Sequence, residues 1–116
     1  MSRADRVGEL LRDEISGILR KKINDPRIGF VSITRVDVTD DLKHARVYVS
    51  IFEDEEKKKT TMKGLESAKR FIMNMIAPSL DLKFLPEITF KQDNSIENAS
   101  RVFEIMHRIK EKGREK

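Results

Sequence analysis

The chain has 116 residues, of which 38% are apolar and another 38% are charged, and its formal net charge is +4 at pH 7. This length suits one domain with a single lean core, and the absence of cysteine excludes disulfides and thiolate metal sites. No apolar run approaches the roughly 18 residues that a membrane span needs, and no apolar signal region precedes the first helix, so we expect a soluble, cytoplasmic protein.

The first predicted element is a helix that ends at Asn24-Asp25-Pro26. Either Ser2 or Asp5 can cap its start, and the residue before Pro26 is disfavoured in the α region. Its apolar residues recur at the i, i+3, i+4 spacing of one buried stripe: Val7, Leu10, Leu11, Ile15, Ile18, Leu19 and Ile23.

Two strands follow, and we expect them to form an antiparallel hairpin with a turn at Asp40-Asp41. In residues 30–38 the apolar positions change parity, which predicts a bulge or twist near Arg35. The second run alternates cleanly, so its odd positions are predicted to face the core: Ala45, Val47, Val49 and Ile51.

The charged segment 53–59 has its acids first and its bases last. Because bases oppose the dipole at a helix N-terminus, we interpret this segment as a solvated connector and expect the second helix to begin at Thr60 or Thr61. Pro78 is expected to end that helix. Its predicted buried stripe is Leu65, Ala68, Ile72, Met75 and Ile76.

An edge strand is predicted over residues 87–92, with Ile88 and Phe90 facing the core and Pro86 at its entry. A last helix is expected to begin at Ser95. Its buried residues would be Ile96, Ala99, Val102, Phe103, Met106 and Ile109. Residues 1–109 are predicted to form a single domain, and the charged tail 110–116 is predicted to fray. The order α-β-β-α-β-α predicts an α+β fold whose three-stranded sheet is covered by helices on one face.

Three segments carry a more specific signal. They are Asp25-Pro26-Arg27 with the strand of residues 30–38, the run of residues 41–50, and the segment 84–90 with Asp93-Asn94-Ser95. Together they resemble the ribosome-binding factor A family, and the resemblance extends from about Arg3 to about Ile109. It implies a fold similar to a type II KH domain, in which a helix–turn–helix beside a sheet clamps single-stranded RNA.

In place of the usual glycine-rich clamp, the family has a kinked helix pair centred on an Ala-x-Gly triplet. The matching triplet here is Ala68-Lys69-Arg70, so arginine replaces the glycine. Glycine would let a phosphate approach the main chain closely, whereas arginine offers a cation that contacts the phosphate from its side chain.

Charge beside a sheet edge and the resemblance together predict an RNA-binding surface. Ten residues are expected to contribute: Arg27, Arg46, Lys63, Ala68, Lys69, Arg70, Lys83, Lys91, Asp93 and Asn94. Five of the cations are expected to line one groove: Lys63, Lys69, Arg70, Lys83 and Lys91. For any one of these cations, a solvated helix or strand face is an equally good interpretation. Phe71 or Tyr48 would permit base stacking if it faced the groove, and most aromatic residues are expected in the core.

Catalysis and metal binding have little support in the sequence. Asp40-Asp41 and Asp93 fit turn and cap chemistry, because Asp side chains bond nearby backbone groups. Neither His44 nor His107 has a second histidine or a cysteine at ligand spacing. We therefore predict no enzymatic activity, no metal and no cofactor.

The resemblance implies a monomeric, non-enzymatic factor that binds the small (30S) ribosomal subunit and 16S rRNA. It would promote late maturation and processing of the precursor rRNA, especially in the cold, with no membrane or small-molecule partner. The alternative is a small α+β adaptor that binds an acidic protein surface through the same cations. RNA binding should weaken steeply with salt, whereas an adaptor with an apolar hot spot should be less sensitive.

Overall fold

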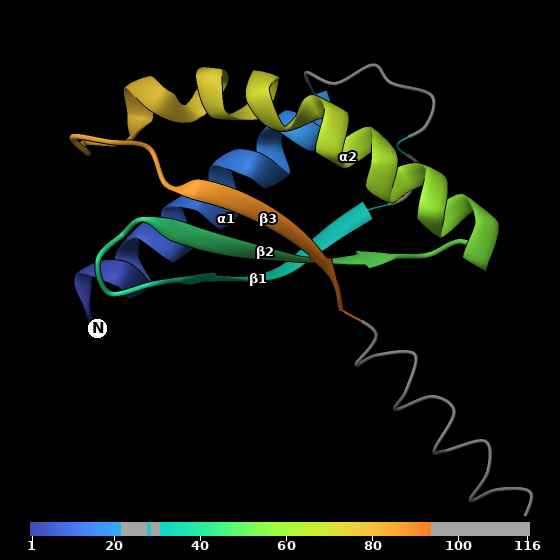
Figure 1. Cartoon of the computed structure of the whole chain (residues 1–116), viewed down its shortest axis with the longest axis horizontal. Coiled ribbons are helices and arrows are strands. Elements are labelled where there is room, and N and C mark those ends of the chain that lie inside the picture. The colour runs from blue at the N-terminus through green and yellow to red at the C-terminus, as the bar shows by residue number, and fades with distance from the viewer. Residues whose placement is uncertain (22–27, 29–30, 94–116) are drawn as a thin grey trace, which may run out of the picture.

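The structure is a computed structural model that describes residues 1–21, 28 and 31–93 (Figure 1). The predicted last helix, the domain boundary at residue 109 and the C-terminal tail lie outside the described residues. The elements follow in this order: α1 (Arg3–Lys21), β1 (Val31–Val38), β2 (His44–Ile51), α2 (Glu55–Ile76), the 3-10 turn η1 (Ala77–Ser79) and β3 (Glu87–Gln92).

The sheet has the order β1-β2-β3, with β1 antiparallel and β3 parallel to β2. Because α2 carries the chain over the sheet between β2 and β3, the parallel pairing is the expected result of a helical crossover. Both helices lie on the same side of the sheet, with β3 at its edge (Figure 1). The predicted α+β, KH-like arrangement is therefore confirmed.

A bulge in β1 accounts for its change of parity. Ile33 pairs with Val49, but the next pair is Arg35 with Tyr48, so Thr34 is an extra residue in the ladder. The inserted residue returns the apolar side chains on both sides of it to one face. The bulge predicted near Arg35 is confirmed, as is the inward orientation of the odd positions of β2.

One core joins the buried stripes of both helices to the inner face of the sheet. Its fully buried large side chains include Leu11, Ile15, Leu65, Ile72, Ile76, Ile88, Val47 and Val49. For the described residues of α1 and α2 the predicted stripes are mostly confirmed, and Ala68 is half-buried against this core. Leu10 and Met75, however, are 36% and 42% exposed, and Met73 is buried instead. Met75 lies at the margin of the stripe, where it lines a hollow beside α1.

The prediction that α2 begins at Thr60 or Thr61 is wrong. The helix begins at Glu55, because the side chain of Asp54 caps it by accepting a hydrogen bond from the Lys57 amide at 2.8 Å. Glu55 and Glu56 then lie in the first turn, where their charge is favourable to the helix dipole. The bases that follow are accommodated by acids one turn earlier: Lys57 Nζ is 3.7 Å from Glu53 Oε2, and Lys58 Nζ is 3.6 Å from Glu55 Oε1.

Ser2 and Asp5 both cap α1, although the sequence indicated either one. The Asp5 amide donates to Ser2 Oγ and the Ser2 amide donates to Asp5 Oδ2, each at 3.1 Å. This reciprocal pair is a capping box with aspartate in place of the more common glutamate. The hydrogen bond from the Ser2 backbone is the main reason that the pKa of Asp5 lies below its usual value.

Gly8 and Gly17 form a matched pair for testing how closely α1 packs on β1. A Cβ at Gly8 would lie 2.8 Å from the carbonyl oxygen of Val36, whereas a Cβ at Gly17 would meet nothing within 4 Å. We expect Gly17→Ala to raise the free energy of unfolding by about 1 kcal/mol through helix propensity. Gly8→Ala should be less stable than Gly17→Ala by about 1–3 kcal/mol, because steric strain against the Val36 carbonyl offsets or exceeds the same gain. Urea denaturation measures both, and a Gly8→Ala protein as stable as Gly17→Ala would contradict the close approach.

In the part of the chain that the structure describes, no helix has the length and apolar character needed to cross a membrane.

Candidate nucleic-acid interface

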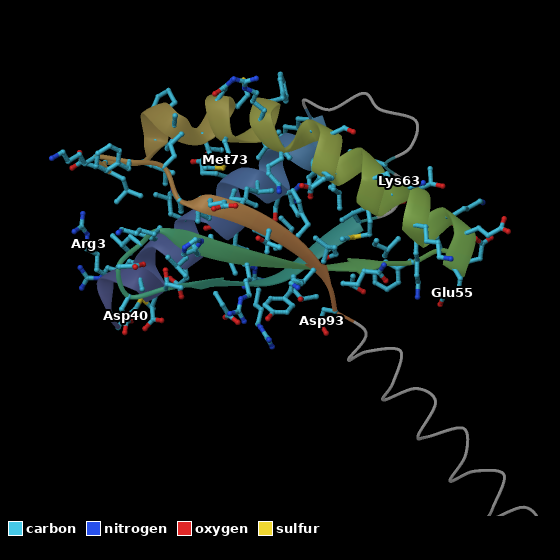
Figure 2. The ribbon with its side chains drawn as sticks, viewed as in Figure 1. Arg3, Asp40, Glu55, Lys63, Met73 and Asp93 are labelled. Carbon is cyan, nitrogen blue, oxygen red and sulfur yellow. The ribbon has the colours of Figure 1, made fainter. Side chains whose placement is uncertain are left out.

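Three of the predicted RNA-binding cations lie along α2. Lys63 and Arg70 are exposed, and the half-buried Lys69 donates through Nζ to Glu66 Oε1 at 2.6 Å. Helical periodicity places Lys69 and Met75 on opposite sides of the buried stripe. Since Met75 lies beside α1, the Lys69 side of α2 faces away from α1, and α2 also packs against the edge strand β3. We call Lys63, Lys69 and Arg70 the α2 cation group (Lys63 is labelled in Figure 2).

The Ala68-Lys69-Arg70 triplet does not divide α2 into two helices. One α-helix runs from Glu55 to Ile76 without interruption, although its axis changes direction along its length (Figure 1). Ala68 packs against the core, so its small side chain lets the helix lie close to the sheet. The expected kinked pair is therefore a single bent helix, and the Arg70 side chain is free to face solvent at the position where the family has glycine.

Two further predicted residues, Arg46 on β2 and Lys91 on β3, lie on the other face of the sheet. Both are exposed and alternate along their strands with core residues such as Val47 and Phe90. Asp93 follows at the end of β3, where its Oδ2 accepts a 2.7 Å hydrogen bond from Thr34 Oγ1 (Figure 2). This bond connects the bulge of β1 to the end of β3 across β2, so Asp93 has a structural role there.

Lys83 lies at a third place, the loop that precedes β3. Its Nζ is 5.7 Å from the centre of the Phe84 ring, and Phe84 itself is 76% exposed. The loop lines a hollow of about 260 Å³ together with Arg3 and the β1–β2 turn.

In that turn Leu42 has φ 62°, a left-handed conformation that is strained for leucine. The sequence gives no sign of it, because the turn has no glycine.

The described structure thus divides the predicted residues among three surfaces. The α2 cation group and Ala68 belong to the first, Arg46, Lys91 and Asp93 to the second, and Lys83 to the third. Arg27 and Asn94 lie outside the described residues. The structure does not gather the five predicted groove cations into one groove. Lys91 points to the outer face of the sheet, α2 with its three cations packs on the other face, and Lys83 lies in the loop before β3.

The aromatic residues are more exposed than the sequence predicted. Phe52, Phe71 and Phe84 are 58%, 46% and 76% exposed, and Tyr48 is half-buried on the outer face of the sheet. Phe90 is buried as expected. Sequence parity did identify Tyr48 as outward, because it alternates with Val47 and Val49, but its neighbours depend on the pairing of the strands.

In the described part of the chain, no three His, Asp or Glu side chains come together in a cluster that could hold a metal ion. Asp41, assigned above to turn chemistry, is engaged in the β1–β2 turn. Its Oδ1 accepts from Thr39 Oγ1 at 2.6 Å and from the Lys43 amide at 3.0 Å. The bond from Thr39 is the main reason that the pKa of Asp41 lies below its usual value, so this carboxylate serves the turn.

Comparison with known proteins adds the family. Residues 3–106 match the family model described as ribosome-binding factor A. The chain belongs to the ribosome-binding factor A family. A relative of that name from Halothermothrix orenii is 46% identical over 109 residues, which cover 94% of this chain and 89% of the relative.

Solved structures of the ribosome-binding factor A family share the fold. A solution NMR structure of a candidate ribosome-binding factor A from Thermotoga maritima is 37% identical, with a TM-score of 0.64 over 80% of this chain and 92% of that one. A homology model of Thermus thermophilus ribosome-binding factor A, fitted into a cryo-EM map of a complex between the 30S subunit and ribosome-binding factor A, is 21% identical. Its TM-score is 0.64 over 78% of this chain and 96% of that one.

Proposed function

We propose that this chain is a non-enzymatic assembly factor that binds the small ribosomal subunit and 16S rRNA in the cytoplasm, as a monomer when it is off the ribosome. The family match over residues 3–106 is the observation that carries the proposal. The family name denotes ribosome binding, and the Thermus thermophilus relative is described in a complex with the 30S subunit. We further propose that binding promotes late maturation of the precursor rRNA, including in the cold.

The α2 cation group is the surface that best suits this role. Arg70 and Lys63 are exposed on one helix, and Lys69 pairs with Glu66 of the same helix. A surface pair of this kind, with Glu66 exposed and Lys69 half-buried, contributes about 0–1 kcal/mol, so Lys69 can exchange Glu66 for a phosphate at little cost. Phosphate contacts from the three cations would position the protein, and the shape of the folded RNA would supply specificity.

Such a factor acts through binding energy. If the protein binds one conformation of the maturing rRNA more tightly than another, it shifts the population toward that conformation by as much as the difference in affinity. No covalent step is needed. A sheet packed on a single core suits this role, because a preorganised surface loses little conformational entropy when it binds.

An adaptor for an acidic protein is the second candidate, and one observation favours it. Phe71 on α2 is 46% exposed close to Arg70, and an exposed aromatic beside a cation is common at protein interfaces. In this case the apolar contact, rather than charge, would provide most of the binding energy.

Co-sedimentation with isolated 30S and 50S subunits across a salt series tests both candidates. We expect binding to the 30S subunit alone. If the α2 cation group neutralises about three phosphates, the affinity should fall about 20- to 40-fold between 50 and 200 mM salt. Binding that is insensitive to salt would favour the adaptor, and absence of binding to either subunit at low salt would contradict the proposal.

A further inference from the structure

The outer face of the sheet carries a row of three side chains that crosses all three strands. Arg35 on β1 pairs with Tyr48 on β2, and Tyr48 pairs with Lys91 on β3. Neighbouring strands lie about 4.8 Å apart, so the row is about 10 Å wide. Both helices pack on the opposite face, and no other described element covers this row. An aromatic ring is therefore placed between two cations on an open surface.

One contact within the row brings a planar cation over an aromatic ring. The guanidinium carbon of Arg35 lies 4.1 Å from the centre of the Tyr48 ring, so a planar cation covers part of the aromatic ring. The Arg35 side chain is 58% exposed, which leaves the guanidinium accessible from solvent. Unpaired bases stack on both kinds of surface, aromatic rings and guanidinium planes.

Two cations act on the Tyr48 phenol. Hydrogen bonding by Arg35, and then by Arg46, lowers the pKa of the Tyr48 phenol, because both cations stabilise its ionised form. Arg46 belongs to the same face, one step along β2. A site that stabilises a phenolate also favours the negative oxygens of a phosphate.

The carboxylates on this face already have partners. Asp37 Oδ2 lies 3.3 Å from Arg35 Nε, Asp93 accepts from Thr34, and Glu87 lies 3.8 Å from His44 at the far end of the strands. Asp37 contacts Arg35 through Nε, and the Arg35 side chain is still 58% exposed, so its guanidinium remains open to a stacked base. Lys91 is exposed and has no carboxylate opposite it in the register.

We propose that Arg35, Tyr48 and Lys91, with Arg46, form a stacking platform for single-stranded RNA. An unpaired base stacks on the Tyr48–Arg35 layer while Lys91 and Arg46 contact the flanking phosphates. This platform is separate from the α2 cation group, on the opposite face of the sheet. The inference rests on the proposed function in that both assume an RNA partner. Duplex RNA is not a suitable occupant, because its bases are already stacked on one another.

The composition of the chain provides a direct test. Tyr48 is the only tyrosine and there is no tryptophan, so intrinsic tyrosine fluorescence reports from this platform alone. We expect a single-stranded oligouridylate or oligoadenylate of 12 nucleotides to quench this fluorescence. An abasic oligonucleotide of equal length, which offers phosphates without bases, should leave it unchanged, as should a duplex of the same sequence. Equal quenching by the abasic or duplex probe would overturn the stacking platform.

Matched variants separate stacking from charge. Fluorescence anisotropy of a labelled oligonucleotide should show that Tyr48→Leu weakens binding about 5- to 150-fold, because one stacked base is lost. Tyr48→Phe keeps the ring and should bind like the wild type, and so should Phe84→Leu, which removes an exposed aromatic on another surface. Loss of binding in Phe84→Leu with none in Tyr48→Leu would also overturn the inference.

The two proposals fail in different ways. A protein that sediments with 30S subunits but whose Tyr48 fluorescence no oligonucleotide changes lacks the platform and keeps the proposed function. A protein that shows base-dependent quenching but does not sediment with either subunit has the platform and lacks the proposed function. Co-sedimentation and Tyr48 fluorescence measured in the same buffer show which of the two proposals fails.

Discussion

Replacing Leu65 with alanine should lower the free energy of unfolding by about 2–5 kcal/mol. Leu65 is fully buried in α2, where the helix packs against the sheet and α1. Truncation removes apolar contacts and leaves a cavity, because close-packed neighbours relax only partly. For a domain of this size such a loss is a large part of the total stability. Urea denaturation followed by circular dichroism at 222 nm measures it.

Phe71→Ala is the matched control for Leu65→Ala. Phe71 lies on the same helix and loses a larger side chain, but it is 46% exposed. We expect its effect on the free energy of unfolding to be much smaller, since exposed substitutions usually change stability by about 0.5 kcal/mol or less. If Leu65→Ala proved neutral, or if Phe71→Ala cost as much, the assignment of the buried face of α2 would be wrong.

The fold follows from local signals that the sequence carries in full. Thr34 is an extra residue in β1, so the positions after it would face the wrong side if the apolar pattern continued unchanged. The apolar residues of β1 therefore change parity at the bulge, which keeps them on one face. Likewise, alternation in β2 specifies which positions are buried, and Pro86 fits the entry to the edge strand. These features depend on neighbours within a few residues, so they can be read from the chain.

The start of α2 shows how two local signals compete. Lys57, Lys58 and Lys59 suggested a later start, but the cap at Asp54 and the acids after it are stronger, because a capping side chain satisfies a backbone amide directly. A cap is typically worth about 1 kcal/mol, and an unfavourable charge near a helix end costs less. The pattern Asp-Glu-Glu could have predicted the observed start.

The candidate sites depend on information that the sequence does not hold locally. Arg35, Tyr48 and Lys91 are brought together by strand register. The bulge shifts the β1–β2 register by one residue, and the parallel pairing sets the β2–β3 register independently. The sequence identified Lys91 and Arg46 as cations and Tyr48 as an aromatic, but it could not show that they share a face opposite to the α2 cation group. The sequence therefore predicted cations that belong to each surface, but it could not predict that they lie on separate surfaces.

Reversing two charges of the α2 cation group should abolish binding to the 30S subunit. In the Lys69→Glu, Arg70→Glu double variant, two contacts to phosphate become repulsive. A hydrogen bond to a charged group contributes about 1.5–3 kcal/mol, so losing two should weaken binding about 10²- to 10⁴-fold. The fold should persist, because Arg70 is exposed and the Lys69–Glu66 pair stabilises it by at most about 1 kcal/mol. Co-sedimentation measures binding, and a thermal melt verifies folding.

A control with the same change in charge distinguishes a specific contact from general attraction. Arg6→Glu with Arg20→Glu on α1 also reverses two exposed cations, and either pair lowers the formal net charge by four, from +4 to zero. If long-range attraction alone held the protein on the subunit, both double variants would lose binding equally. A local phosphate contact predicts that only the α2 variant does. Unchanged binding by a folded α2 variant would exclude this surface, and the stacking platform on the opposite face of the sheet would then be the leading candidate for the rRNA contact.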